Sequence, residues 1–113
     1  MVIQVEEIYK SIAENVVNNV QDGWVEAFID VKRAANDALA LSGGYKTGSE
    51  NFISFKFRNF DRRIIEDFHL LHSATTTESK GWNCAKFTLY PTGKISIDFE
   101  WDQDLADEVE ANS

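Results

Sequence analysis

One stretch of the sequence holds side chains whose types and spacing suit a metal ion. Glu66, His69 and His72 follow one another at intervals of three residues, and carboxylates and imidazoles are common ligands of transition metals. On a helix each such step drifts by about 60° around the axis, so the third group turns away from the first. No distant segment supplies a further ligand. We therefore expect no metal and no other cofactor, and the alternative function is a metal-binding protein or small metal-dependent enzyme that uses Glu66, His69 and His72.

A second set of candidate groups lies near the C-terminus, where Asp98, Glu100 and Asp102 are spaced by two residues. In a β-strand such residues project from one face, about 6 to 7 Å apart. The acid and base of a hydrolytic enzyme instead face each other across the substrate, one of them in an apolar pocket. The spacing therefore predicts an acidic strand face and no catalytic residues.

Other catalytic signatures are missing from the sequence. The serine nucleophile motif and the phosphate-binding glycine loop are absent. The single cysteine, Cys84, has no adjacent base and no partner for an internal disulfide, so we expect a packed thiol in a reducing compartment. No run of about 20 apolar residues is present, and MVIQVEEIYK lacks the pattern of a secretory signal. We expect a cytoplasmic protein that is not an enzyme.

The charge of the chain is concentrated at one end. The formal net charge is −8, and residues 94–113 hold one lysine and seven carboxylates, which accounts for −6 of it. Binding to nucleic acid or to an anionic membrane requires a basic surface, so neither is expected as a partner. A basic protein partner is favoured instead.

The elements that must position these groups follow from hydrophobic spacing. Apolar residues from Val5 to Val20 recur every three or four positions, which predicts an amphipathic helix that ends near Gly23. Along residues 24–32 small and branched apolar side chains alternate with a mixed set, which predicts a strand with one buried face. Residues 33–51 fit either a short helix or a strand at 38–41, of which we favour the strand, before a loop marked by glycines 43, 44 and 48.

The second half of the chain predicts a strand, a helix and a hairpin. Residues 52–58 alternate, and a helix through about residue 73 follows, with Ile64, Ile65, Phe68 and Leu71 inside and Asp67 outside. A loop then runs to residue 81, and strands at 82–90 and 95–101 flank a Pro-Thr-Gly turn. Beyond residue 102 the sequence fits a short helix over Leu105 and Val109, or a flexible acidic tail from about residue 103, which we favour.

Together these elements predict one α+β domain over residues 1–113. An antiparallel sheet of about four to five strands is packed by the N-terminal helix and by the second helix, which precedes the C-terminal hairpin. In that sheet the last strand presents Ile95, Ile97, Phe99 and Trp101 to the core, and its acidic residues to solvent.

Three stretches carry a resemblance to a known family. EEIYKSIAENVV, then GWVEAFIDV, then GWNCAKFTLYPTGKISIDFEWD occur in the order found in the YezG-like family of bacterial immunity proteins. The likeness is greatest in the closing hairpin, which pairs a Trp-Asn opening strand with an I-x-I-D-F-x-W-D return strand. It covers about half of the chain, and residues 33–60 match poorly.

The resemblance implies an antitoxin that neutralises a cognate bacterial toxin, often a nuclease domain delivered between competing cells. A nuclease carries a cationic cleft for phosphate, so an acidic strand face would complement it. The residues expected to bind the toxin are Asp98, Glu100, Asp102 and Asp104, with Trp82 and Tyr90 as aromatic anchors. The simpler interpretation is that these carboxylates form a solvated face that protects an edge strand from aggregation.

Overall fold

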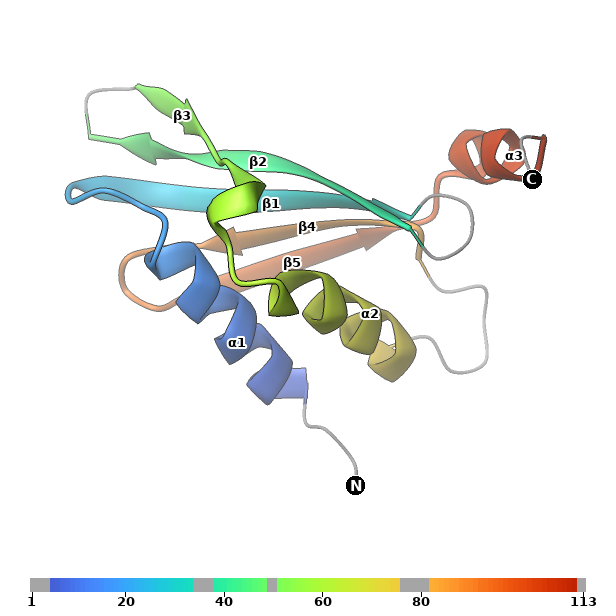
Figure 1. Ribbon diagram of the computed structural model, residues 1–113, viewed down its shortest axis with the longest axis horizontal. Helices are drawn as coiled ribbons and strands as arrows, with labels where there is room; N and C mark the ends of the chain where they lie inside the picture. Colours follow the sequence, from blue (N-terminus) through green and yellow to red (C-terminus); the bar gives the residue numbers. More distant parts are fainter. Residues whose placement is uncertain (1–4, 34–37, 49–50, 76–81, 112–113) are drawn as a thin grey trace.

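The protein folds into two layers, a five-stranded antiparallel sheet and two helices, α1 (Val5–Val17) and α2 (Arg63–Thr75), which pack on one of its faces (Figure 1). The computed structural model describes residues 5–33, 38–48, 51–75 and 82–111. From one edge of the sheet to the other, the strands are β3 (Phe52–Ser54), β2 (Leu39–Thr47), β1 (Trp24–Arg33), β4 (Cys84–Leu89) and β5 (Ile95–Glu100). None of the helices in these ranges is long and apolar enough to cross a membrane. In chain order the elements are α1, β1, β2, β3, η2 (Phe57–Asn59), α2, β4, β5 and α3 (Gln103–Ala111). The predicted α+β class is confirmed.

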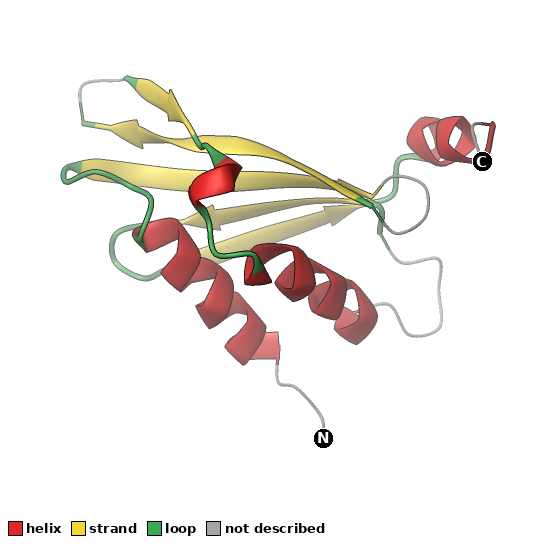
Figure 2. Ribbon diagram, in the orientation of Figure 1, coloured by secondary structure: helices red, strands yellow, loops and turns green. Residues whose placement is uncertain are grey.

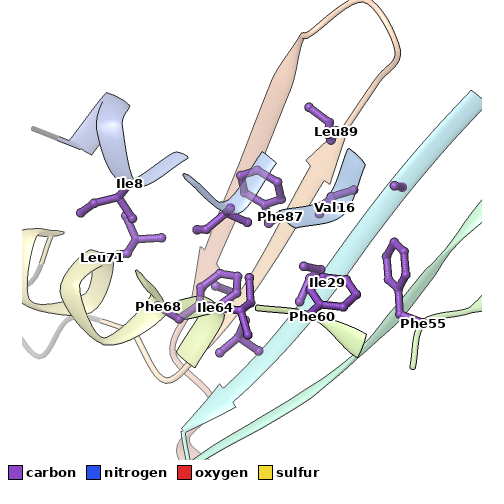
Figure 3. Close-up of a cluster of buried hydrophobic side chains, with 14 of the residues drawn as sticks. Ile8, Val16, Ile29, Phe55, Phe60, Ile64, Phe68, Leu71, Phe87 and Leu89 are labelled. Atoms are coloured by element: carbon purple, nitrogen blue, oxygen red, sulfur yellow. The ribbon is translucent and has the colours of Figure 1, made fainter. Parts of the chain in front are cut away.

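The hydrophobic core lies between the sheet and these two helices (Figure 3). Ile29 of β1 and Phe87 of β4 are paired across neighbouring strands, and both are 0% exposed. Ile12 of α1 and Leu71 of α2 are equally buried. Alternation along the strands and the three-to-four spacing along the helices therefore predict most of the core correctly. The first helix ends at Val17, several residues before its predicted end.

The second strand is longer than the sequence predicts, because β2 runs through the expected loop glycines. Gly43 adopts a φ of 141°, and a Cβ added there would collide with the Phe28 carbonyl oxygen. A Cβ at Gly44 would collide with the carbonyl oxygen of Ile53 on the other side. The glycines therefore permit close approach of neighbouring backbones, and the Phe52 ring covers Gly44.

The strand predicted at residues 52–58 ends early, and this expectation was wrong in its second half. β3 stops at Ser54, and η2 forms a 3₁₀ turn shortly afterwards. Three phenylalanine rings cause the change in direction: the Phe60 centroid lies 5.1 Å from Phe55 and 4.9 Å from Phe57. Packing these rings together bends the chain out of the sheet and leads it to the helical layer.

The helix α2 is confirmed, and its buried face differs from the predicted one at two positions. Ile64 and Phe68 are buried as predicted, whereas Ile65 is exposed and Asp67, assigned to solvent, is only 7% exposed. The Ser11 hydroxyl of α1 donates a 2.7 Å hydrogen bond to Asp67 Oδ2. A polar partner on the adjacent helix therefore accommodates a carboxylate that the amphipathic pattern places outside.

The C-terminal hairpin is confirmed. The Tyr90 N–H donates a 3.0 Å hydrogen bond to the Lys94 carbonyl oxygen, and Gly93 takes the positive φ of 90° that the turn needs. The loop predicted before the hairpin begins later than expected, since α2 extends to Thr75. Residues 76–81 of that loop lie outside the described residues.

The chain beyond β5 forms α3 and not the irregular tail that we favoured. Asp102 caps this helix, because its Oδ1 accepts a 3.1 Å hydrogen bond from the Leu105 N–H. Asn83 in turn holds the main chain of Asp102: its Oδ1 accepts from the Asp102 N–H at 2.7 Å, and its Nδ2 donates to the Asp102 carbonyl at 2.8 Å. A helix of nine residues is marginal alone in water. These tertiary contacts therefore help to fix where it begins.

Candidate functional site

The outer face of the sheet is the surface opposite α1 and α2, and no described helix packs across it (Figure 2). Its centre is built from cross-strand neighbours. Lys86 of β4 lies between Asp30 of β1 and Asp98 of β5, and the next row places Cys84 between Lys32 and Glu100. These six residues line a shallow depression of about 510 Å³. The two carboxylates predicted from the strand pattern are therefore neighbours on an open surface.

The outer face is less uniformly acidic than the sequence of β5 alone predicts, because Lys32 and Lys86 alternate with the carboxylates. The Lys86 ammonium nevertheless turns toward β1, where its Nζ lies 4.8 Å from the centroid of the Phe28 ring. In the described part of the chain, no salt bridge involves Asp98 or Glu100. Both side chains are exposed. Their charges are therefore available to a partner.

The two remaining acidic candidates have different surroundings. The carboxylate of Asp102 is half-buried and serves as the cap of α3, so its first role is structural. Asp104 is exposed in the first turn of α3, where the partial positive charge of a helix N-terminus favours a carboxylate. With Asp107, Glu108 and Glu110, it continues the negative charge of β5 along a helix that lies beyond the end of the sheet (Figure 1).

The prediction that Trp82 is a surface anchor was wrong, because this residue lies in the core and is 3% exposed. Its Nε1 donates a 2.8 Å hydrogen bond to Thr75 Oγ1, and its ring stacks on Phe99 with centroids 5.1 Å apart. Trp101, which strand parity assigns to the core, is instead half-buried just after β5. Its Nε1 donates a 2.9 Å hydrogen bond to Gln103 Oε1.

The other aromatic candidate, Tyr90, is half-buried beside the hairpin turn and lines a groove of about 550 Å³ between α1 and that turn. Val17 of α1, Trp24 of β1 and Ile95 of β5 contribute apolar side chains to the same groove. Sequence reasoning missed this groove, because its residues come from three separate segments. The sequence offered no signal for it, because Val17 continues the helical stripe expected to face the core and only the structure shows that it is exposed.

The three side chains of the alternative metal site are not brought together as a ligand set. Glu66 is exposed, and His69 is half-buried on the same helix. His72 Nε2 lies 3.0 Å from the Trp82 carbonyl oxygen and 3.0 Å from Arg33 Nη1, within hydrogen-bonding distance of both. Within residues 5–33, 38–48, 51–75 and 82–111, no three His, Cys, Asp or Glu side chains form a group that could hold a metal ion.

Cys84 occupies the rim of the depression and is half-buried. Burial raises the pKa of its thiol, and the negative charge of Asp102 raises it further. A thiol with a raised pKa stays protonated at neutral pH and is a weak nucleophile. The side chain is therefore a poor nucleophile, but it is less buried than the packed thiol that the sequence predicts.

Asp67 is a second buried titratable group, located between α1 and α2. Burial raises the pKa of this carboxyl, while the hydrogen bond from Ser11 opposes the shift. Its side chain faces the helix interface, away from the outer face of the sheet, so it belongs to the packing of the two helices.

No protein-family model and no curated protein matches this chain.

Proposed function

We propose that this protein is a cytoplasmic immunity protein of the YezG-like kind. It would bind and neutralise a cognate bacterial toxin, a cationic nuclease domain used in competition between cells, without catalysing a reaction. The proposal is supported first by the exposed carboxylates of Asp98 and Glu100 on a sheet face that no described helix covers. The order of the motifs quoted from the sequence is its second support.

The electrostatics of the surface explain how such a protein would act. Attraction between β5 and a cationic cleft would accelerate encounter, and the bound immunity protein would occupy the approach of the nucleic-acid substrate. Asp104 and the other acidic residues of α3 extend the negative surface beyond the sheet. Lys86, held over Phe28, does not pair with Asp98 and so leaves it free to meet the partner.

A double charge reversal, Asp98→Lys with Glu100→Lys, tests the proposal against candidate toxin domains, sought among the products of neighbouring genes. Asp102 is left unchanged because it caps α3. We expect association to slow by roughly 10- to 100-fold, since steering by opposite charge is replaced by repulsion. Cells that produce the toxin domain together with this double variant should lose protection.

A matched control carries Glu7→Lys with Glu66→Lys, two exposed carboxylates on the opposite layer. It changes the net charge by the same amount, so an effect of net charge alone would weaken toxin binding equally in both variants. Full protection by the Asp98 and Glu100 variant, with normal folding, would reject the acidic face as the binding surface.

A further inference from the structure

In the part of the chain that the structure describes, the edge strand β5 carries an unused set of backbone hydrogen-bonding groups. It is last in the strand order and, within the described ranges, pairs only with β4. The hydrogen bond from the Tyr90 N–H to the Lys94 carbonyl oxygen shows that these two residues form a hydrogen-bonded pair at the turn end of the β4–β5 ladder. Hydrogen-bonded pairs recur every second residue in an antiparallel ladder, so the main chains of Ser96 and Asp98 point toward β4. Those of Ile97 and Phe99 therefore point to the open edge.

The hydrophobic layer under the sheet is incomplete at this edge. Phe87 of β4 is 0% exposed, but its neighbour Ile97 is only half-buried. Ala85 is buried as well, but its neighbour Phe99 is 39% exposed. The layer is complete as far as β4 and partly open at β5, where another strand would cover it.

The two faces of β5 differ in chemistry. Ile95, Ile97 and Phe99 point toward the helices, while Asp98 and Glu100 point to the outer face. A strand added beside β5 would place alternate side chains against each set. Apolar side chains suit the first face, and lysine or arginine suits the second.

We propose that β5 accepts an extended segment of a basic partner as a sixth strand, with apolar and basic side chains alternating along that segment. This inference rests on the proposed function, because it describes how the cationic toxin domain docks. It adds backbone pairing to the electrostatic attraction, and it gives the exposed Phe99 a binding role.

A second copy of this chain is a poor occupant for the same edge. Pairing β5 with its own copy in antiparallel fashion would set Asp98 and Glu100 of one molecule against the same carboxylates of the other. Like charges at an edge oppose such self-association. The sign of the charge therefore selects a basic partner.

The first test uses a synthetic nine-residue peptide that alternates lysine and valine, with lysine at both ends. At a concentration about ten times its Kd, it should slow amide hydrogen exchange at Ile97 and Phe99 about tenfold. The amides of Ser96 and Asp98 already bond to β4 and should change little. A control peptide keeps the five lysines and has proline at its two central valines, which prevents pairing. Equal binding of both peptides, with no slowed amide, would overturn the proposal.

A variant of the protein gives the second test. Ile97→Pro removes an N–H that points away from β4, so it blocks the edge without removing a donor from the ladder. Ile97→Thr is the matched control, because it keeps the N–H and the branched side chain. We expect proline to weaken peptide binding at least tenfold and threonine to have little effect. Equal binding by two folded variants would contradict the proposal, and if the proline variant does not fold, the exchange measurement alone decides.

A candidate toxin domain, sought among the products of neighbouring genes, separates this inference from the proposed function. A complex in which exchange at Ile97 and Phe99 stays fast would reject strand addition and leave the proposed function intact. Peptide pairing without any binding of the toxin domain would reject the proposed function and leave the edge as a docking site for another basic protein.

Discussion

The centre of the sheet and its β5 edge have the same alternating pattern but different environments. In the centre, Ile29 and Phe87 are fully buried under α1 and α2. At the edge, Phe99 has the same parity relative to the core and remains partly exposed, while the opposite face carries exposed carboxylates. The centre therefore provides most of the folding stability, and the edge provides a surface whose groups contribute less to folding.

The largest expected effect is a difference in stability loss between two alanine variants, one from each region. Phe87→Ala should lower the free energy of unfolding by about 3 to 5 kcal/mol, because it leaves a cavity in a fully packed core. Phe99→Ala should cost only about 1 to 2 kcal/mol, since much of that side chain already contacts water. Chemical denaturation of both variants measures the difference, and equal losses would show that β5 contributes to the core as β4 does.

The next largest effect should come from breaking the contact between the sheet and α3. Asn83→Ala would leave the Asp102 N–H and carbonyl without their side-chain partner, at a cost of about 1 to 3 kcal/mol. Amide exchange in α3 should accelerate more than exchange in β1, because the contact holds the helix start. A control, Asp102→Asn, keeps a good capping residue and should leave α3 formed. Unchanged α3 exchange in the alanine variant would show that the helix forms independently of the sheet.

The buried carboxylate between the helices predicts a dependence of stability on pH. Burial raises the pKa of Asp67 above its usual value of 3.8, so the folded state holds this proton more tightly than the unfolded state. The resulting stabilisation is complete below 3.8 and is lost as the pH rises through the raised pKa. Asp67→Asn should remove this contribution, so the stability of the wild type relative to the variant should fall as the pH rises across that window. A difference that does not vary with pH would contradict the assignment.

The smallest expected effect on folding stability comes from changing the acidic residues of the β5 edge. The Asp98→Lys and Glu100→Lys double variant should change the free energy of unfolding by no more than about 0.5 kcal/mol per substitution, because both side chains are exposed. Thermal and chemical denaturation provide the measurement. A large loss of stability would mean that these carboxylates support the fold, and the contrast between the centre and the edge would then fail.

Sequence periodicity was sufficient for the α+β class, most of the core and the C-terminal hairpin. It failed where a contact between distant segments overrides a local pattern. The phenylalanine cluster around Phe60 ends β3 early, and Ser11 allows Asp67 to face inward. Of the proposed binding residues, Asp98 and Glu100 lie where strand alternation predicts, whereas Trp82 lies in the core.

The sequence by itself determined the two faces of each strand and the accumulation of carboxylates at the C-terminal end, because side-chain direction in a strand depends only on residue parity. Only the tertiary structure decided which strands lie at the edge and where α3 begins. It also decided that Lys86 turns toward Phe28 while Asp98 stays open to solvent. These features depend on which segments become neighbours, and local spacing along the chain carries no direct record of that choice.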